Sequence, residues 1–160
     1  MLNFDYSIGT KIFFGKDKID VLASNIKKYG SNVLLVYGGG SIKRSGLYDK
    51  IVTIFNKNDI EFCELSGVEP NPRITSVRKG IELCRENKVD IILAVGGGSV
   101  IDCSKVIGAG YYYNGDAWDI VLDSRKITKV LPIATILTLA ATGSEMDARS
   151  EEHTSELQSQ

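Results

Sequence analysis

Short apolar segments alternate with longer amphipathic ones along most of this chain. Four short segments are predicted to be strands: residues 33–37, 60–65, 91–95 and 130–136. Four longer segments space their apolar side chains at helical intervals: residues 17–29, 47–56, 74–87 and 100–110. A strand-like segment at residues 11–15 comes before them. Because strands that alternate with helices of this length indicate parallel βαβ crossovers, we expect an α/β fold with a Rossmann-like parallel sheet.

The composition indicates the class of protein and the cellular compartment in which we expect it. The 160 residues are 43% hydrophobic and 24% charged, which is typical of a soluble globular domain. We find no apolar run long enough for a membrane span and no secretory signal at the N-terminus, so we expect a cytoplasmic protein. A net charge of −1 gives no electrostatic reason to bind nucleic acid. The three widely spaced cysteines predict buried thiols in a reducing compartment and not a disulfide framework or a zinc site.

The last twelve residues differ in composition from the rest. Residues 149–160 contain Leu157 as their one apolar side chain, and residues 149–159 resemble the in-frame translation of a common sequencing-library adapter. An ordinary polar terminus is the alternative. We therefore expect one native domain over residues 1–148 and a non-native polar tail over residues 149–160. The only histidine, His153, lies in that tail, so we predict no metal-ligating residue in this chain.

Two glycine-rich turns follow predicted strands, at residues 38–41 and 96–99. Glycine has no Cβ to keep a ligand away from the backbone, and a helix that begins there adds its positive end, so both turns suit a phosphate group. Turns with a purely structural role are the alternative, and Ser99 with Asp102 could simply stabilise the start of a helix. Neither turn satisfies the G-x-G-x-x-G fingerprint, because its sixth position holds Lys43 or Ile101.

Other polar and aromatic positions allow two interpretations each. No acidic residue follows the first strand, so a 2′-phosphate is tolerated there, and Lys43 is either its partner or a solvated surface side chain. The polar segment at residues 138–145 offers hydroxyl groups to a ligand, or forms a turn that satisfies them itself. Trp118 is interpreted as a half-buried packing residue in preference to a stacking site.

Five motifs in order carry a family resemblance over essentially all of residues 1–148. They are Phe13-Phe14-Gly15, Tyr37-Gly38-Gly39-Gly40-Ser41-Ile42-Lys43, Val68-Glu69-Pro70-Asn71-Pro72, Gly96-Gly97-Gly98-Ser99 with Asp102 and Lys105, and Ala141-Thr142-Gly143-Ser144-Glu145. Together they resemble the group III iron-containing alcohol dehydrogenases, and among them the clostridial NAD(P)H-dependent butanol dehydrogenases.

The resemblance implies an oxidoreductase that interconverts primary alcohols and aldehydes with NAD(P)H. It implies that residues of this chain bind the cofactor: Gly97, Gly98 and Ser99 with Asp102 at the pyrophosphate, Gly38, Gly39 and Ser41 at the adenosine ribose, Pro70 and Asn71 at the adenine, and Thr138, Leu139 and Thr142 between pyrophosphate and nicotinamide. It further implies a homodimer, and an all-helical C-terminal domain that supplies one Asp and three His to a divalent metal, iron or zinc.

That helical domain is missing from this sequence, and with it the metal ligands. We therefore expect no catalytic residue here, and an inactive chain that is the N-terminal, cofactor-binding part of a longer enzyme. A free-standing nucleotide-binding module without chemistry is one alternative. A related enzyme of the glycerol dehydrogenase or dehydroquinate synthase type is another.

Overall fold

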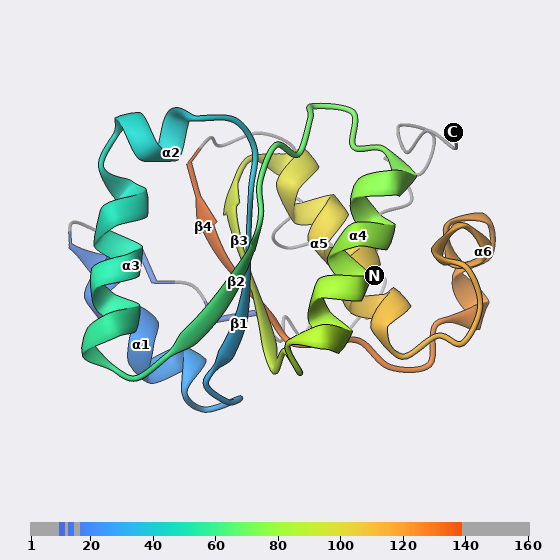
Figure 1. The fold of residues 1–160 in the computed structure, drawn as a ribbon, viewed down its shortest axis with the longest axis horizontal. Helices are drawn as coiled ribbons and strands as arrows, with labels where there is room; N and C mark the ends of the chain where they lie inside the picture. Colours follow the sequence, from blue (N-terminus) through green and yellow to red (C-terminus); the bar gives the residue numbers. More distant parts are fainter. Residues whose placement is uncertain (1–9, 12, 15–16, 139–160) are drawn as a thin grey trace, which may run out of the picture.

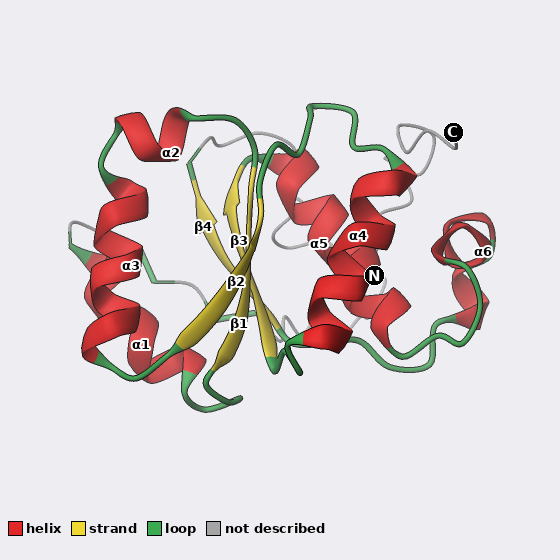
Figure 2. Cartoon of the chain, viewed as in Figure 1, coloured by secondary structure: helices red, strands yellow, loops and turns green. Residues whose placement is uncertain are grey.

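A four-stranded parallel sheet between two layers of helices forms the body of the chain (Figures 1 and 2). The computed structural model describes residues 10–11, 13–14 and 17–138. In chain order the elements are a 3-10 helix Lys18–Val21, α1 Leu22–Ile26, β1 Asn32–Tyr37, α2 Ser41–Arg44, α3 Leu47–Lys57, β2 Glu61–Leu65, α4 Ile74–Glu86, β3 Ile91–Gly96, α5 Gly98–Tyr111, α6 Ala117–Leu122, a 3-10 helix Ser124–Lys126, and β4 Ile133–Leu137. The predicted α/β class with a Rossmann-like parallel sheet is confirmed.

The strand order places β1 and β3 at the centre. The order is β2-β1-β3-β4, and all three pairs are parallel. From β1 the chain moves outward to β2, then crosses back over β1 to β3, so the direction of winding reverses between β1 and β3. The carboxyl ends of two strands on either side of such a reversal diverge into loops on opposite faces, which leaves a crevice between them. Both glycine-rich turns lie at this point.

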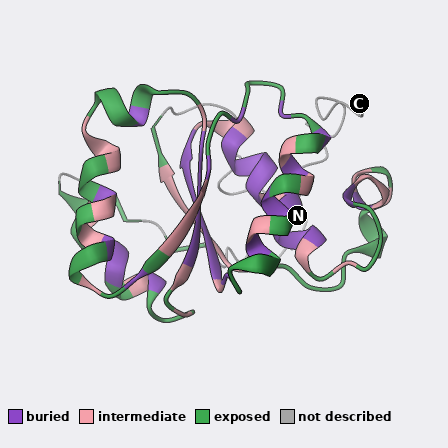
Figure 3. Ribbon diagram, viewed as in Figure 1, coloured by how far each residue is buried: buried purple, intermediate pink, exposed green. Residues whose placement is uncertain are grey.

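Alternating side chains of the central strands form two separate cores. In β1, Leu34 and Val36 face α4, α5 and α6, whereas Val33 and Leu35 face α1, α2 and α3. The same alternation holds in β3, as the two-residue period of a strand requires. Both central strands are buried almost throughout (Figure 3). Helices on both faces explain why these strands are apolar at nearly every position and do not alternate with polar residues.

Several boundaries differ from those that the sequence predicts. The expected helix over residues 17–29 is a 3-10 turn followed by the five-residue α1. A separate four-residue α2 precedes α3, and Gly46, with a φ of 81°, makes the left-handed turn between them. The strand expected over residues 130–136 begins only at Ile133, after Pro132, which has no N–H to donate. Of the strand-like segment 11–15, the described residues Lys11, Phe13 and Phe14 have no regular secondary structure.

Like α2, the helix α6 that follows α5 is not predicted from the sequence. Its N-cap is Asp116, whose carboxylate accepts a hydrogen bond from the backbone N–H of Trp118 at 2.8 Å. Trp118 packs half-buried against the core under α4 and α5, as predicted. None of the described helices is long and apolar enough to cross a membrane.

Candidate functional site

The carboxyl ends of β1 and β2 are tied together by their own loops. The N–H of Gly67 donates to the carbonyl of Gly38 at 2.8 Å, and the N–H of Val68 donates to the carbonyl of Tyr37 at 3.2 Å. A Cβ added at Gly38 would lie 3.1 Å from the Val68 carbonyl oxygen. The first glycine turn therefore fits closely against the loop after β2, which leaves little room for a side chain at Gly38.

Gly39, by contrast, faces open space. A Cβ added there would meet no described heavy atom within 4 Å, and its φ lies outside the left-handed range. The fold alone therefore does not require glycine at this position. A backbone that a ligand approaches closely would require it.

The second glycine turn leads directly into α5. Gly96 ends β3 with a φ of 154°, and Gly97 is the N-cap of the helix. Gly98 and Ser99 thus belong to the first turn, and the predicted start at residue 100 is wrong by two residues. No side chain among the described residues caps this end. The first backbone N–H groups of this fourteen-residue helix therefore lie at the crevice, where they suit an anion.

The predicted capping role of Ser99 is wrong. Its hydroxyl donates a hydrogen bond to the carbonyl oxygen of Pro70, in the loop after β2. A residue inside the first turn has helical backbone angles, so its side chain does not take the N-cap position. The contact instead joins the α5 terminus to the loop that carries Asn71. Pro70 and Asn71 are both exposed there.

The remaining predicted residues extend this arrangement. Thr138 follows β4, and its N–H donates to the Gly96 carbonyl at 3.1 Å. Asp102 lies one turn into α5 and is 2% exposed. Ser41 begins α2 and is exposed. Leu139 and Thr142 lie outside the described residues, as does the tail over residues 149–160. The structure thus gathers the ten described members of the predicted set at one edge of the sheet, along the top in Figure 1.

Beside the first turn lies a cluster of two tyrosines around Glu64. The hydroxyls of Tyr37 and Tyr48 both donate to the Glu64 carboxylate, the first at 3.5 Å. The hydrogen bond from Tyr48 to Glu64, and to a smaller extent burial, raises the pKa of Tyr48 to about 12. The ammonium of Lys43 lies over both rings, 4.9 Å from the Tyr48 centroid and 5.8 Å from that of Tyr37. Lys43 is an exposed surface side chain, as one of its two interpretations has it, and its ammonium also contacts these two aromatic faces.

Two arginines on α4 connect this helix to α5 and α6. Arg78 makes a two-pronged ion pair with Asp116, at 2.9 and 3.0 Å, which lowers the pKa of that carboxyl. Arg85 donates to the carbonyls of Gly110, Tyr111 and Tyr113 at the end of α5. Carbonyls at a helix C-terminus have no partner within the helix, so Arg85 supplies one. The sequence analysis missed both arginines, since their partners are more than twenty residues away.

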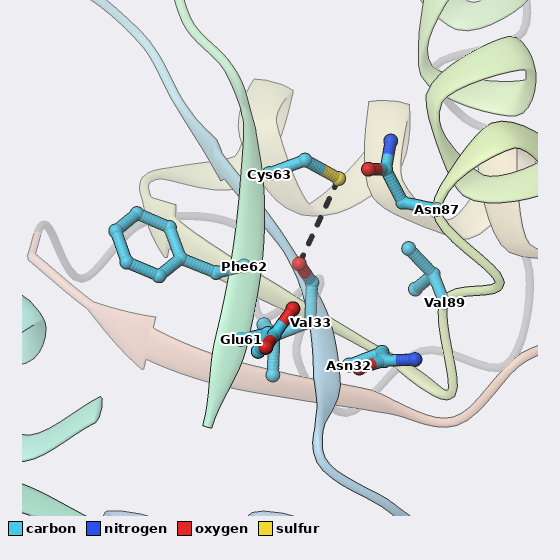
Figure 4. Close-up of a pocket in the computed structure, with 7 residues that line it drawn as sticks. All are labelled: Asn32, Val33, Glu61, Phe62, Cys63, Asn87 and Val89. Carbon is cyan, nitrogen blue, oxygen red and sulfur yellow. Dashed lines mark hydrogen bonds between the residues drawn. The ribbon is translucent and has the colours of Figure 1, made fainter. Parts of the chain in front are cut away.

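The small cavity of about 50 Å³ in Figure 4 lies at the opposite edge of the sheet. Asn32, Glu61 and Cys63, from the first half of β1 and β2, contribute to its lining. Cys63 is half-buried, and burial raises the pKa of its thiol. Cys84 and Cys103 are buried, and burial raises the pKa of each to about 12. The cavity is lined by residues at the amino ends of β1 and β2, away from the glycine turns at their carboxyl ends.

No three His, Cys, Asp or Glu side chains in the described ranges come close enough together to hold a metal ion. The groups that the residues at the crevice offer are mostly backbone amides and side-chain hydroxyls, and several of these residues are glycines. This donor set suits phosphate and ribose groups, and does not fit a divalent metal.

Comparisons with known proteins agree with this geometry. The iron-containing alcohol dehydrogenase family matches residues 9–155. NADH-dependent butanol dehydrogenase A of Clostridium acetobutylicum is 73% identical over 147 residues, which are 92% of this chain and 38% of that protein. NADPH-dependent aldehyde reductase YqhD of Escherichia coli is 40% identical over 92% of this chain and 38% of its own length.

A solved structure shares the fold closely. The crystal structure of NADH-dependent butanol dehydrogenase A from Thermotoga maritima superposes with a TM-score of 0.85 at 46% identity, over 90% of this chain and 36% of that one. The chain thus spans somewhat over a third of the length of the relatives it matches. Because the family match covers nearly the whole sequence, this chain belongs to the iron-containing alcohol dehydrogenase family.

Proposed function

We propose that this chain is the cofactor-binding part of an NAD(P)H-dependent and metal-dependent alcohol dehydrogenase that interconverts primary alcohols and aldehydes of the butanol and butanal type. The observation that carries the proposal is the convergence of both glycine turns and the α5 N-terminus at the β1/β3 reversal. The 73% identity to a protein named NADH-dependent butanol dehydrogenase A supports the substrate class.

Each part of the crevice has a role in this proposal. The amides of Gly97, Gly98 and Ser99 bind the pyrophosphate, since a helix N-terminus stabilises negative charge. Gly38, Gly39 and Ser41 line the adenosine ribose. The Pro70–Asn71 loop, tied to Ser99, covers the adenine side. Thr138 extends the site toward the nicotinamide, which supplies the hydride when the cofactor is bound.

The conversion of alcohol to aldehyde requires a second part of the protein. The described residues do not fit the metal, so we propose that its ligands come from a helical domain outside this chain, and that the chain by itself does not turn over alcohol. A homodimer of the longer protein and a cytoplasmic location belong to the same proposal. The three free thiols support a reducing compartment.

Cofactor titration of the chain, followed by NADH fluorescence, tests the binding site. Gly98→Val blocks the α5 amides, and we expect it to weaken NADH binding by at least about tenfold, since hydrogen bonds to a charged phosphate are strong. Gly39→Val is a second variant that open space around the added side chain allows to fold. Thr53→Val, an exposed change on α3, is the control. Unchanged affinity in both glycine variants would refute the assignment.

Sequencing of the source DNA beyond codon 148 tests the longer enzyme. We expect the reading frame to continue and to encode one Asp and three His at metal-binding spacing, with butanal-dependent NADH oxidation in the longer product and none in this chain. A native stop codon at that point would instead favour the non-catalytic nucleotide-binding module.

A further inference from the structure

The loop after β2, residues 66–73, is the green segment at the top of Figure 1 that leads into α4. Its start is fixed by the backbone hydrogen bonds from Gly67 and Val68 to the first glycine turn, and Val68 is 5% exposed. Near its other end, Pro72 is buried just before α4 begins. The tip between these two anchors, residues 69–71, is exposed. The contacts of this tip therefore decide how firmly the loop lies over the crevice.

The hydroxyl of Ser99 holds the tip against α5. It donates a hydrogen bond to the carbonyl oxygen of Pro70, 29 residues earlier in the chain. A second contact of the tip is the ion pair between Glu69 and Arg73 at 3.5 Å, whose side chains are 61% and 47% exposed. An ion pair this exposed contributes little. Ser99 therefore supplies the contact that joins the tip to the second glycine turn.

The hydrogen bond to Pro70 also determines what the Ser99 hydroxyl can offer to a ligand. A serine hydroxyl has one O–H donor and two acceptor lone pairs. The Pro70 carbonyl takes the donor, so lone pairs are what the hydroxyl presents to the crevice, and these do not attract an anion. A phosphate needs donors, and the backbone N–H groups at the start of α5 supply them.

We infer that Ser99 is a positioning residue, whose hydroxyl holds the tip of the loop over the crevice for the adenine and does not bind the pyrophosphate. A loop that is held in place beforehand favours binding, because the cofactor then does not have to order it. The backbone N–H of Ser99 stays available to the pyrophosphate. Two groups of one residue thus serve two parts of the cofactor.

The inference rests on the proposed function, because it assumes that the pyrophosphate lies at the start of α5 and the adenine at the Pro70–Asn71 loop. It predicts that loss of the Ser99 hydroxyl weakens the binding of ligands that carry adenosine and leaves the binding of the phosphates alone unchanged. A hydroxyl that contacted the pyrophosphate itself would affect both kinds of ligand.

Titrations of the full chain with NADH, ADP and inorganic pyrophosphate test this inference. NADH binding is followed by its fluorescence, and the other two ligands by their displacement of NADH. We expect Ser99→Ala to weaken the binding of NADH and ADP about fivefold, the effect of one neutral hydrogen bond, and to change pyrophosphate binding less than about twofold. Ser99→Thr keeps a hydroxyl and should restore most of the loss.

Ser24→Ala is the matched control. The hydroxyl of Ser24, on α1, also donates to a backbone carbonyl, that of Val21 at 3.1 Å, and Ser24 lies outside the proposed cofactor site. We expect no change in the three affinities of this variant. Hydrogen–deuterium exchange without ligand is a second measurement, in which a peptide that covers residues 66–72 should exchange faster in Ser99→Ala than in the parent and in Ser99→Thr. Thermal melting verifies that each variant folds.

The outcomes separate this inference from the proposed function. An equal loss for ADP and pyrophosphate in Ser99→Ala would show that the hydroxyl contacts the phosphates. Unchanged affinities for all three ligands would show that the hydroxyl has no part in binding. Either result overturns the inference and leaves the cofactor site in place, whereas failure of the unmodified chain to bind NADH and ADP would overturn both. A loss limited to NADH and ADP, which Ser99→Thr restores, supports the inference.

Discussion

Gly80 of α4 packs closely against Ile107 of α5, and a double-mutant cycle at these two positions tests how α5 is held. A Cβ added at Gly80 would lie 2.4 Å from Cδ1 and 2.8 Å from Cγ1 of Ile107, and 3.2 Å from a methyl group of Leu65. Ile107 is 0% exposed, so its side chain has little space into which to move. Gly80→Ala therefore forces a shift of α5, the helix whose first turn lies in the crevice.

The magnitude follows from two opposing effects. Alanine in place of glycine favours a helix by about 1 kcal/mol. Overpacking a buried contact costs roughly 1–3 kcal/mol. We therefore expect Gly80→Ala to lower the free energy of unfolding by about 1 kcal/mol. Ile107→Val removes Cδ1, the nearest atom, and alone costs roughly 0.5–1.5 kcal/mol.

In the double variant the new methyl group fills the space that Cδ1 leaves. We expect the double variant to be about 1 kcal/mol more stable than the sum of the two single losses. Urea unfolding followed by circular dichroism measures all four proteins. Additivity within about 0.5 kcal/mol, or a Gly80→Ala variant more stable than the parent, would show that the two helices do not pack this closely.

Three further predictions concern the supports of the same helices. Arg78 lowers the pKa of Asp116 below 3.8, so the ion pair stabilises the fold above that pH and is lost as the pH falls through the lowered pKa. Asp116→Asn, which keeps an N-cap side chain, should have a lower melting temperature than the parent at neutral pH. This difference in melting temperature should disappear in acid, and a difference that does not depend on pH would contradict the ion pair. Arg85→Met should lower the free energy of unfolding by roughly 1–3 kcal/mol in urea titrations, because carbonyls at the end of α5 lose their donor; an unchanged midpoint would show that water replaces the arginine. Native alkylation read by mass spectrometry should leave Cys84 and Cys103 unmodified until the protein unfolds, since burial covers both thiols and raises their pKa to about 12.

The sheet was predictable from sequence because its strands are buried on both faces. Continuous apolar runs such as residues 33–37 and 91–95 carry that signal locally, and the glycines that follow mark where each strand ends. The position of both turns at one edge follows from parallel strands alone. The sequence therefore predicts that both glycine turns lie at the same end of the sheet, as they do in the structure.

Features that depend on contacts between distant segments were not predictable. The start of α5 at Gly98 depends on the turn at Gly96 and on the loop after β2, where the Pro70 carbonyl accepts a hydrogen bond from the Ser99 hydroxyl. The position of the Lys43 ammonium depends on the rings of Tyr37 and Tyr48, and the sequence does not show that these two rings lie together.

Hydrogen–deuterium exchange of the chain with and without NADH shows directly where the cofactor binds. We predict slower exchange in peptides that cover residues 38–41, 67–71 and 97–101, at the β1/β3 crevice. Peptides that cover residues 61–63 and 87–89, around the cavity at the other edge, should not change. Protection confined to that cavity, or no protection at saturating NADH, would show that the cofactor does not bind at the glycine turns.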